Sequence, residues 1–123
     1  MSQMTWTTAQ QAAIDARGQN LLLSAAAGSG KTAVLTERIK KLITDMDDPA
    51  DITELLVLTF TRASAGEMKT RISSGIAKAL SEAEQEQNTP LVRHLSRQLA
   101  LMSSAQISTL DSFFQTLIRR YFY

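Results

Sequence analysis

Residues 24–35, SAAAGSGKTAVL, constrain the fold of this chain more than any other stretch of its sequence. An apolar run, residues 21–23, comes directly before them. In residues 31–44 the apolar positions recur every three or four residues, as on one face of a helix. Glycines permit the curvature that turns backbone N–H groups toward one point, and a helix N-terminus adds partial positive charge there. A strand, a glycine-containing loop and a helix in this order predict a turn that binds phosphate.

The loop matches the pattern G-x-x-x-x-G-K-[ST] at Gly30, Lys31 and Thr32, and Ala25 occupies the opening position where the pattern has glycine. A small residue is tolerated there when its φ is negative. We expect Lys31 to reach the β- and γ-phosphates of a nucleotide and the Thr32 hydroxyl to bind Mg²⁺. Motif and context agree, which disfavours the alternative of a plain strand–helix turn. The predicted nucleotide site comprises Ala25, Ala26, Ala27, Gly28, Ser29, Gly30, Lys31, Thr32 and Ala33, with Lys31 and Thr32 as its catalytic residues.

Helix-like and strand-like segments alternate along the whole chain. Helices are expected at residues 5–18, 31–44, 63–87, 90–102 and 111–123. Strands are expected at residues 20–25, 55–60 and 105–110, the first two of them buried. Strands separated by helices favour parallel pairing with right-handed crossovers. The prediction is an α/β fold, a parallel sheet flanked by helices, in one domain over residues 1–123.

Some boundaries can be predicted more closely. The first helix is expected to be capped by Thr7 or Thr8 and stopped by Gly18, and the last to be capped by Asp111 or Ser112. The acidic residues 45–54 read as a surface loop, and the polar residues 82–88 as a frayed or solvated helix end.

Composition excludes several kinds of function. A net charge of +1 produces no strong field toward nucleic acid, so any DNA contact has to be local. Without cysteine the chain forms neither disulfides nor thiolate metal sites, which fits a reducing cytosol. The N-terminal residues do not read as a signal peptide, and no apolar run is long enough for a membrane span. We therefore expect a cytoplasmic protein without a membrane partner, and a structural role for His94 among leucines.

Three further stretches contribute candidate ligand-binding residues. Gln10 carries an amide that can pair with the N6/N7 edge of adenine, although a plain surface glutamine is the simpler interpretation. Phe60 stands between two threonines where the second strand ends, and it can either stack on a base or join the core. Ser108, Thr109 and Ser112 surround the end of the third strand. All three strand ends are expected at one edge of a parallel sheet, where ligands bind in such folds.

Taken together, these stretches resemble the first motor domain of the UvrD/Rep-like superfamily 1 DNA helicases. That family combines a glutamine motif, A-x-A-G-S-G-K-T, T-F-T-N-x-A-A-x-E-M-x-x-R and S-T-x-H-S-F, in this order. The segments NLLLSAAAGSGKTAVLTERI and QLALMSSAQISTLDSFFQTLIRRYFY are most similar to AddA-type subunits of bacterial helicase–nucleases. The resemblance covers residues 5–123 and implies a P-loop NTPase (RecA-like) fold.

The resemblance also implies roles for individual residues. Gln10 is expected to read the adenine of ATP, while Gly28, Gly30, Lys31 and Thr32 hold its phosphates and Mg²⁺. Two positions depart from the family pattern. Arg62 stands where the family has asparagine, and Asp111 stands where it usually has histidine. The carboxylate of Asp111 places a negative charge beside the expected DNA. Cysteine is common where Phe114 stands. The implied single-stranded-DNA contacts are Thr59, Phe60, Thr61, Arg62, Ser108, Thr109 and Ser112.

The implied parent is an ATP hydrolase, a 3′-to-5′ DNA helicase with an associated exonuclease in recombinational double-strand-break repair. Its expected partners are single-stranded DNA, duplex ends and an AddB-type subunit. No apolar strand of this sequence ends in the Asp-Glu pair that orients the attacking water, and the chain closes on an aromatic helix. We therefore expect an incomplete motor domain, an N-terminal fragment without turnover that self-associates through apolar faces. The alternatives are a small P-loop nucleotide kinase and a non-catalytic nucleotide-binding module.

Overall fold

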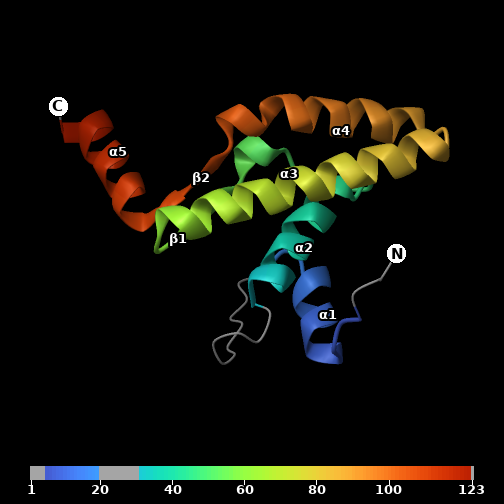
Figure 1. The fold of residues 1–123 in the computed structure, drawn as a ribbon, viewed down its shortest axis with the longest axis horizontal. Helices are drawn as coiled ribbons and strands as arrows, with labels where there is room; N and C mark the ends of the chain where they lie inside the picture. The colour runs from blue at the N-terminus through green and yellow to red at the C-terminus, as the bar shows by residue number, and fades with distance from the viewer. Residues whose placement is uncertain (1–4, 20–30, 123) are drawn as a thin grey trace.

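The computed structural model describes residues 5–19 and 31–122 (Figure 1). The expected strand at residues 20–25 and most of the glycine-containing loop therefore lie outside the described residues. Two 3₁₀ turns are labelled η1 and η2. The elements in chain order are α1 (Thr8–Asp15), α2 (Lys31–Thr44), η1 (Ile52–Glu54), β1 (Leu56–Thr59), α3 (Arg62–Gln85), α4 (Thr89–Leu101), η2 (Met102–Ser104), β2 (Gln106–Thr109) and α5 (Leu110–Phe122).

The two described strands lie side by side and run parallel, as their separation by helices predicts. Their register places Leu56 opposite Gln106 and Thr59 opposite Thr109. The connection between them is the antiparallel pair α3 and α4, which lie side by side in Figure 1. The described part of the chain is thus a mixed α/β structure with a two-stranded parallel sheet.

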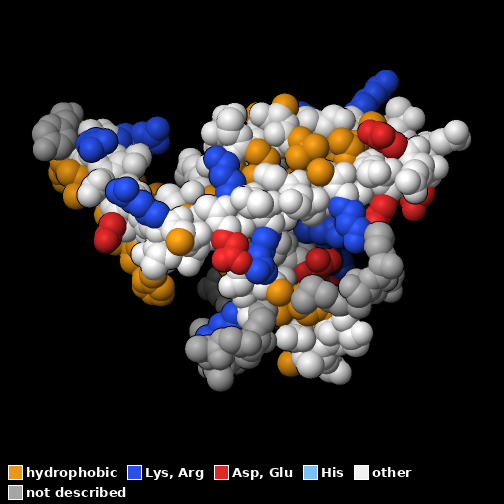
Figure 2. All heavy atoms as spheres, in the orientation of Figure 1, with side chains coloured by type: hydrophobic (Ala, Val, Ile, Leu, Met, Phe, Trp, Pro, Cys, Tyr) orange, Lys and Arg blue, Asp and Glu red, His pale blue; other side chains and the backbone are white. Residues whose placement is uncertain are grey.

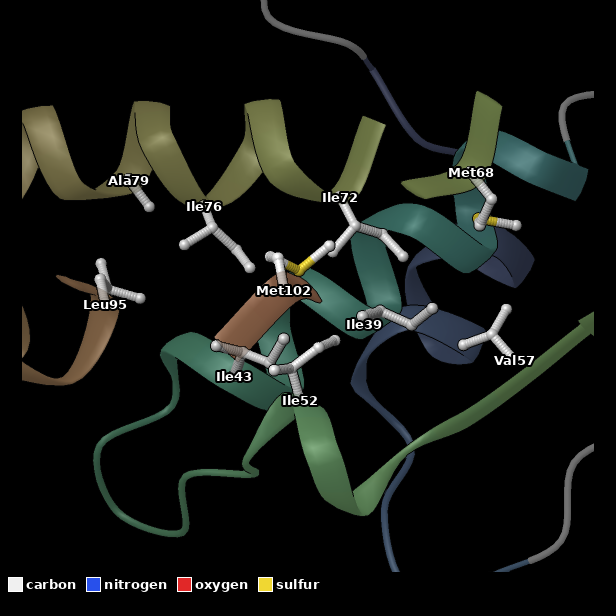
Figure 3. Packing of buried hydrophobic residues seen from close by; sticks show 10 residues of the cluster. All are labelled: Ile39, Ile43, Ile52, Val57, Met68, Ile72, Ile76, Ala79, Leu95 and Met102. Atoms are coloured by element: carbon white, nitrogen blue, oxygen red, sulfur yellow. The ribbon is translucent and has the colours of Figure 1, made fainter. Parts of the chain in front are cut away.

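The hydrophobic core lies where α3 packs against α2, α4 and the strands. Met68, Ile72 and Ile76 recur at steps of four along α3, and each is at most 3% exposed, as the periodicity predicts. Figure 3 shows these side chains pointing from α3 toward Ile39 and Ile43 of α2. On α4, Leu91, Leu95 and Leu99 recur at steps of four; Leu95 is fully buried, and the other leucines pack around the same cluster.

The expectation that β1 is buried on both faces is wrong. Val57 is 7% exposed, but Leu56 and Leu58 are 46% and 36% exposed. Successive side chains of a strand point to opposite faces of the sheet, and among the described elements the core with α3 covers only the Val57 face. Within the described residues, the second face of this short sheet, which carries Leu56 and Leu58 beside Gln106 and Ser108, is therefore left open.

The end of α3 is an ordered turn and not a frayed helix. The helix continues to Gln85, and Ala83 in its last turn is 1% exposed. Gln87 adopts a φ of +57°, which lets the N–H of Asn88 return to the Ala83 carbonyl at 2.9 Å. The glutamates of this segment are solvated, as expected. Asn88 then caps α4, and Pro90 occupies its first turn, where the missing N–H of proline costs no intrahelical hydrogen bond.

The segment between α2 and β1 is mostly exposed, as a surface loop should be, but it contains one core residue. Ile52 in η1 is 1% exposed, and its N–H donates to the Oε1 of Gln98 on α4 at 2.6 Å. Gln98 is itself fully buried, and its Nε2 has no partner among the described residues. His94 has the structural role expected of it, since its Nε2 lies 2.8 Å from the carbonyl oxygen of Ile43.

Candidate functional site

The N-terminus of α2 presents the three described residues of the predicted phosphate loop, Lys31, Thr32 and the half-buried Ala33. Lys31 and Thr32 are exposed and form the first turn of the helix, which contains no acidic residue. The first N–H groups of a helix lack intrahelical acceptors, so this end carries partial positive charge. A cation, a hydroxyl and the amide donors of a helix N-terminus, with no carboxylate in the first turn, fit a magnesium-bound phosphate group. Residues 25–30 lie outside the described residues, so their predicted roles stay predictions.

Gln10 belongs to the cap that begins α1. The Thr7 hydroxyl accepts a hydrogen bond from the Gln10 N–H at 3.1 Å, and the Gln10 Oε1 accepts one from the Thr7 N–H at 2.9 Å. Thr7 is therefore the helix cap, one of the two residues expected. An amide oxygen has two lone pairs, so Oε1 keeps acceptor capacity and Nε2 keeps both donors. The cap orients the amide without consuming the groups that adenine recognition needs.

Helix α1 ends earlier than its glycine suggests. Its last residue is Asp15, and the N–H of Ala16 closes the final turn on the Ala12 carbonyl at 3.0 Å. Gly18 adopts a left-handed φ of +72° two residues after that cap. The chain thus turns at Gly18, but the helix stops before it.

An apolar cluster and several ion pairs hold α1 against α2. Ala13 and Ile14 of α1 pack on Val34 of α2, with Trp6 beside them. The Lys41 ammonium hydrogen-bonds to the Asp15 carboxylate, and this bond lowers the pKa of Asp15 below its usual value. Further along, the guanidinium of Arg17 binds the carboxylates of Asp45 at 2.8 Å and Asp48 at 3.2 Å. The helix that carries Gln10 is therefore fastened to the helix that carries Lys31.

Arg38 of α2 donates hydrogen bonds to the end of α1, and nothing in the sequence pattern pointed to this role. Its Nη1 donates to the carbonyl oxygen of Ala13 at 2.7 Å and also to that of Ala16. An arginine next to the apolar position Ile39 on a helix is indistinguishable in sequence from a solvated surface cation. Only the tertiary packing brings the end of α1 within its reach.

The structure brings two of the predicted motifs together at one edge of the sheet. Thr59 and Thr109 are paired as the last residues of their strands, although 50 positions separate them in the chain. The Thr59 hydroxyl donates to the Thr61 carbonyl at 3.1 Å and approaches the Ser108 carbonyl at 3.5 Å. Phe60 follows directly and is 91% exposed, so the alternative that it belongs to the core is wrong.

Several hydroxyls at this edge also cap helices. The Thr61 hydroxyl accepts from the Ser64 N–H at 3.0 Å and begins α3. Thr109, which is 7% exposed, accepts from the Ser112 N–H at 3.1 Å and donates to the Ser112 hydroxyl at 2.9 Å. Thr109 thus caps α5, and the expectation of Asp111 or Ser112 as the cap is wrong. The strand and helix share one boundary residue here, which a linear pattern does not reveal.

The charged and aromatic residues of the edge remain exposed. Arg62 begins α3, and Asp111 lies in the first turn of α5, where the positive end of the helix favours a carboxylate. Both side chains are exposed, as is Phe60. These three side chains are therefore available to an external ligand, while the buried hydroxyl of Thr109 has a structural role.

Helix α5 carries an uncovered apolar face. It has no buried residue, and Phe114 and Ile118 are about half exposed, at 51% and 49%, with Tyr121 and Phe122 more so. Figure 2 shows hydrophobic side chains on the surface over this helix. A groove of about 280 Å³ separates α5 from the strands, lined by Leu56, Ile107, Phe113, Leu117 and Arg120 among others.

Within residues 5–19 and 31–122, no three His, Cys, Asp or Glu side chains gather as metal ligands would. In the same part of the chain, each helix is too short or too polar to cross a membrane.

The chain matches the family model described as the UvrD/REP helicase N-terminal domain over residues 6–123. It is 51% identical over 123 residues to an ATP-dependent helicase/nuclease subunit from Desulforamulus reducens. It is 53% identical over 118 residues to the protein of the same name from Alkaliphilus metalliredigens, and 53% over 119 residues to that from Bacillus licheniformis. These alignments cover 96 to 100% of this chain but 9% of each relative, so the chain spans about a tenth of their length. With a match over nearly its whole length, the chain belongs to the UvrD/REP helicase N-terminal domain family.

Proposed function

We propose that this chain is the ATP- and single-stranded-DNA-binding part of an ATP-dependent 3′-to-5′ DNA helicase–nuclease. The observation that carries the proposal is the sheet edge, where motifs 50 residues apart meet beside Phe60, which is 91% exposed. The relatives, which are named as ATP-dependent helicase/nuclease subunits, support the same activity for a longer protein. We extend the proposal to a P-loop, RecA-like motor domain, incomplete within residues 1–123.

In this proposal, ATP and Mg²⁺ bind at the N-terminus of α2. Lys31 neutralises phosphate charge, Thr32 contributes a hydroxyl to the metal, and the Gln10 amide pairs with adenine. The nucleotide supplies the free energy of phosphoanhydride hydrolysis when it is bound. The residues of this chain bind and orient it, and the exposed, acid-free first turn of α2 supports that role.

Single-stranded DNA lies along the sheet edge in the same proposal. Phe60 offers an exposed ring on which a base can stack, and the Arg62 guanidinium lies at the start of the next helix to meet a phosphate. Thr59, Thr61, Ser108, Thr109 and Ser112 contribute mainly by shaping the edge, because their hydroxyls are largely engaged within the protein. Asp111 weakens the contact with DNA locally.

The isolated chain is proposed to bind nucleotide with little turnover, because its sequence offers no strand-end acidic pair to orient water. In the longer protein we propose action on duplex ends during recombinational double-strand-break repair, with an associated exonuclease and an AddB-type partner subunit. A cytoplasmic location stays a prediction. The family match does not favour the nucleotide-kinase alternative, and a non-catalytic binding module describes the isolated chain alone.

Titration with a fluorescent ATP analogue and Mg²⁺, with and without single-stranded DNA, tests the proposal. We expect saturable binding that is lost in Lys31→Ala and that tightens when DNA is added. Lys69→Ala is the matched control, because Lys69 is an exposed lysine of α3 and its loss should leave binding unchanged. Equal binding by wild type and Lys31→Ala would contradict the nucleotide site, and phosphoryl transfer to a mononucleotide would favour the kinase.

The isolated chain is also proposed to self-associate through the exposed apolar face of α5. Ile118→Glu places a charge in the middle of that face, beside Phe114 and Tyr121. We expect wild type to exceed the monomer mass in light scattering at high concentration, and Ile118→Glu to return it to the monomer. A wild-type monomer at every concentration would contradict this expectation.

A further inference from the structure

We propose that Arg38 is a positioning residue for adenine recognition: it fixes Gln10, on α1, relative to the phosphate-binding end of α2. The inference rests on the proposed function, because it assumes that Gln10 reads the base and Lys31 meets the phosphates. The inference adds Arg38, a residue that contacts neither the base nor the phosphates in this proposal. Arg38 acts through the backbone of α1.

The contacts of Arg38 are with groups that α1 cannot satisfy itself. The last carbonyls of a helix lack intrahelical donors, and in this helix the Ala13 and Ala16 carbonyls receive the Arg38 Nη1 instead. The bond to Ala13 is 2.7 Å long and partly buried. A cation at this end also meets the negative end of the helix dipole. Charge-assisted bonds of this kind are stronger than neutral ones.

Helix α1 depends on such contacts for its orientation. It has only eight residues, and isolated helices shorter than about 12 residues are marginal in water. Its apolar anchor is small, since Ala13 and Ile14 are its only buried residues. The ion pairs Lys41–Asp15 and Arg17–Asp48 have exposed partners, and such pairs contribute little. The Arg17–Asp45 pair at 2.8 Å is half-buried, but both of its residues lie beyond the ends of α1 and α2. Of the polar contacts that side chains of α2 make with α1 and its cap, those of Arg38 are the partly buried ones, so Arg38 most restricts how α1 lies on α2.

The geometry links the base-reading and phosphate-binding ends directly. Gln10 precedes Ala13 by three residues, about one helical turn, and Arg38 follows Lys31 by seven, about two turns. Both segments are continuous helix. The covalent chain of a nucleotide limits how far its base and phosphates can lie apart, so the distance between Gln10 and Lys31 must stay within that range. Arg38 is the polar bridge between the two helices closest to both ends.

The proposal predicts a loss of base selectivity and not a general loss of binding. In Arg38→Met the side chain keeps most of its apolar length but donates no hydrogen bond. Adenine presents a donor and an acceptor to a glutamine amide, whereas guanine presents two acceptors and tripolyphosphate has no base. We expect the affinity for ATP to fall about tenfold or more, toward the affinity for GTP, while the affinity for tripolyphosphate changes less than about twofold.

The test compares wild type, Arg38→Met, Arg38→Lys and Arg71→Met in this chain. Arg71→Met is the matched control, because it removes an arginine whose surface ion pair with Glu67 lies on α3. ATP, GTP and tripolyphosphate are titrated against each variant with Mg²⁺, and amide hydrogen exchange is followed in α1 and α3. Arg38→Lys keeps a donor and should restore part of the selectivity. Exchange should accelerate in α1 of Arg38→Met and stay unchanged in α3.

The outcomes separate this inference from the function on which it rests. Wild-type selectivity for ATP that disappears in Arg38→Met, with tripolyphosphate binding intact, supports the inference. Selectivity that survives in Arg38→Met overturns the positioning role and leaves the proposed function standing. An equal loss for all three ligands assigns Arg38 to general stability and also overturns it. A wild type that binds no ligand, or does not prefer ATP, contradicts the proposed nucleotide site and the inference with it.

Discussion

Replacing Phe60 by alanine should separate DNA binding from folding more cleanly than any other change in this chain. The Phe60 ring is 91% exposed, immediately after the strand β1 that anchors it. A residue with so little buried surface contributes almost nothing to packing, so Phe60→Ala should shift the free energy of unfolding by less than about 0.5 kcal/mol. A phenylalanine this exposed is unusual for a stable domain, and its proposed role is to stack on a base.

The expected loss of DNA affinity follows from the value of one stacked base. Stacking on an aromatic side chain is worth about 1–3 kcal/mol, which corresponds to a Kd raised roughly five- to 150-fold. Ile76 provides the opposite case, because it is fully buried in the core. Ile76→Ala should cost about 2–5 kcal/mol of stability, through lost transfer energy and an unfilled cavity. One variant should therefore affect binding alone, and the other stability first.

The assay is fluorescence anisotropy of a labelled single-stranded oligonucleotide, with urea unfolding of the same protein samples. The binding series is repeated at two salt concentrations, because a stacking contribution varies little with salt while phosphate contacts vary strongly. Unchanged DNA affinity in Phe60→Ala would falsify the base-stacking role. A loss of more than about 1 kcal/mol in stability would instead show that the exposed ring supports the fold.

Two further predictions concern local structure. Thr109→Val keeps the buried shape but removes the acceptor of the Ser112 N–H. It should therefore lower the free energy of unfolding by about 1 kcal/mol and speed hydrogen exchange in the first turn of α5. Thr116→Val, at an exposed position of the same helix, should change neither quantity. Hydrogen bonds from the Thr53 side chain and backbone hold the pKa of Asp51 below its ordinary value of 3.8. A lowered carboxyl pKa contributes stability that is present above pH 3.8 and lost as the pH falls through the pKa of the folded state. Asp51→Asn should therefore flatten the decline in unfolding free energy below pH 3.8. An acid-unfolding curve that is the same in wild type and Asp51→Asn would contradict this prediction.

Much of the fold could be predicted from local patterns. The helices at residues 31–44 and 90–102, the faces that carry Met68 and Leu95, and the parallel pairing of the two described strands were all predictable. Helical periodicity and capping residues act over a few neighbours, so they are legible in a linear string. The ends of the two described strands did meet at one edge, because parallel strands present the same end to the same side of a sheet. The third expected end, that of residues 20–25, lies outside the described residues.

The errors arose where one residue has contacts on several sides. An apolar strand was expected to be covered on both faces, but Leu56 and Leu58 are open because the core with α3 covers one face. Thr109 ends a strand and caps a helix at once, so the cap was expected further along. The polar residues after Glu82 end in a closed turn because the backbone at Gln87 reaches a left-handed conformation.

By itself, the sequence determined the kinds and order of the helices and strands in the described part of the chain, because these depend on residue spacing and on backbone groups near in the chain. The phosphate-binding role of the start of α2 stays a prediction from the same kind of local pattern. Tertiary structure alone decided which residues hold the site in place. Arg38 reaches the end of α1 from a helix more than 20 residues away, and Phe60 at the end of β1 is left 91% exposed. Periodicity predicts which face of a helix is buried, but it does not say which distant segment packs against that face.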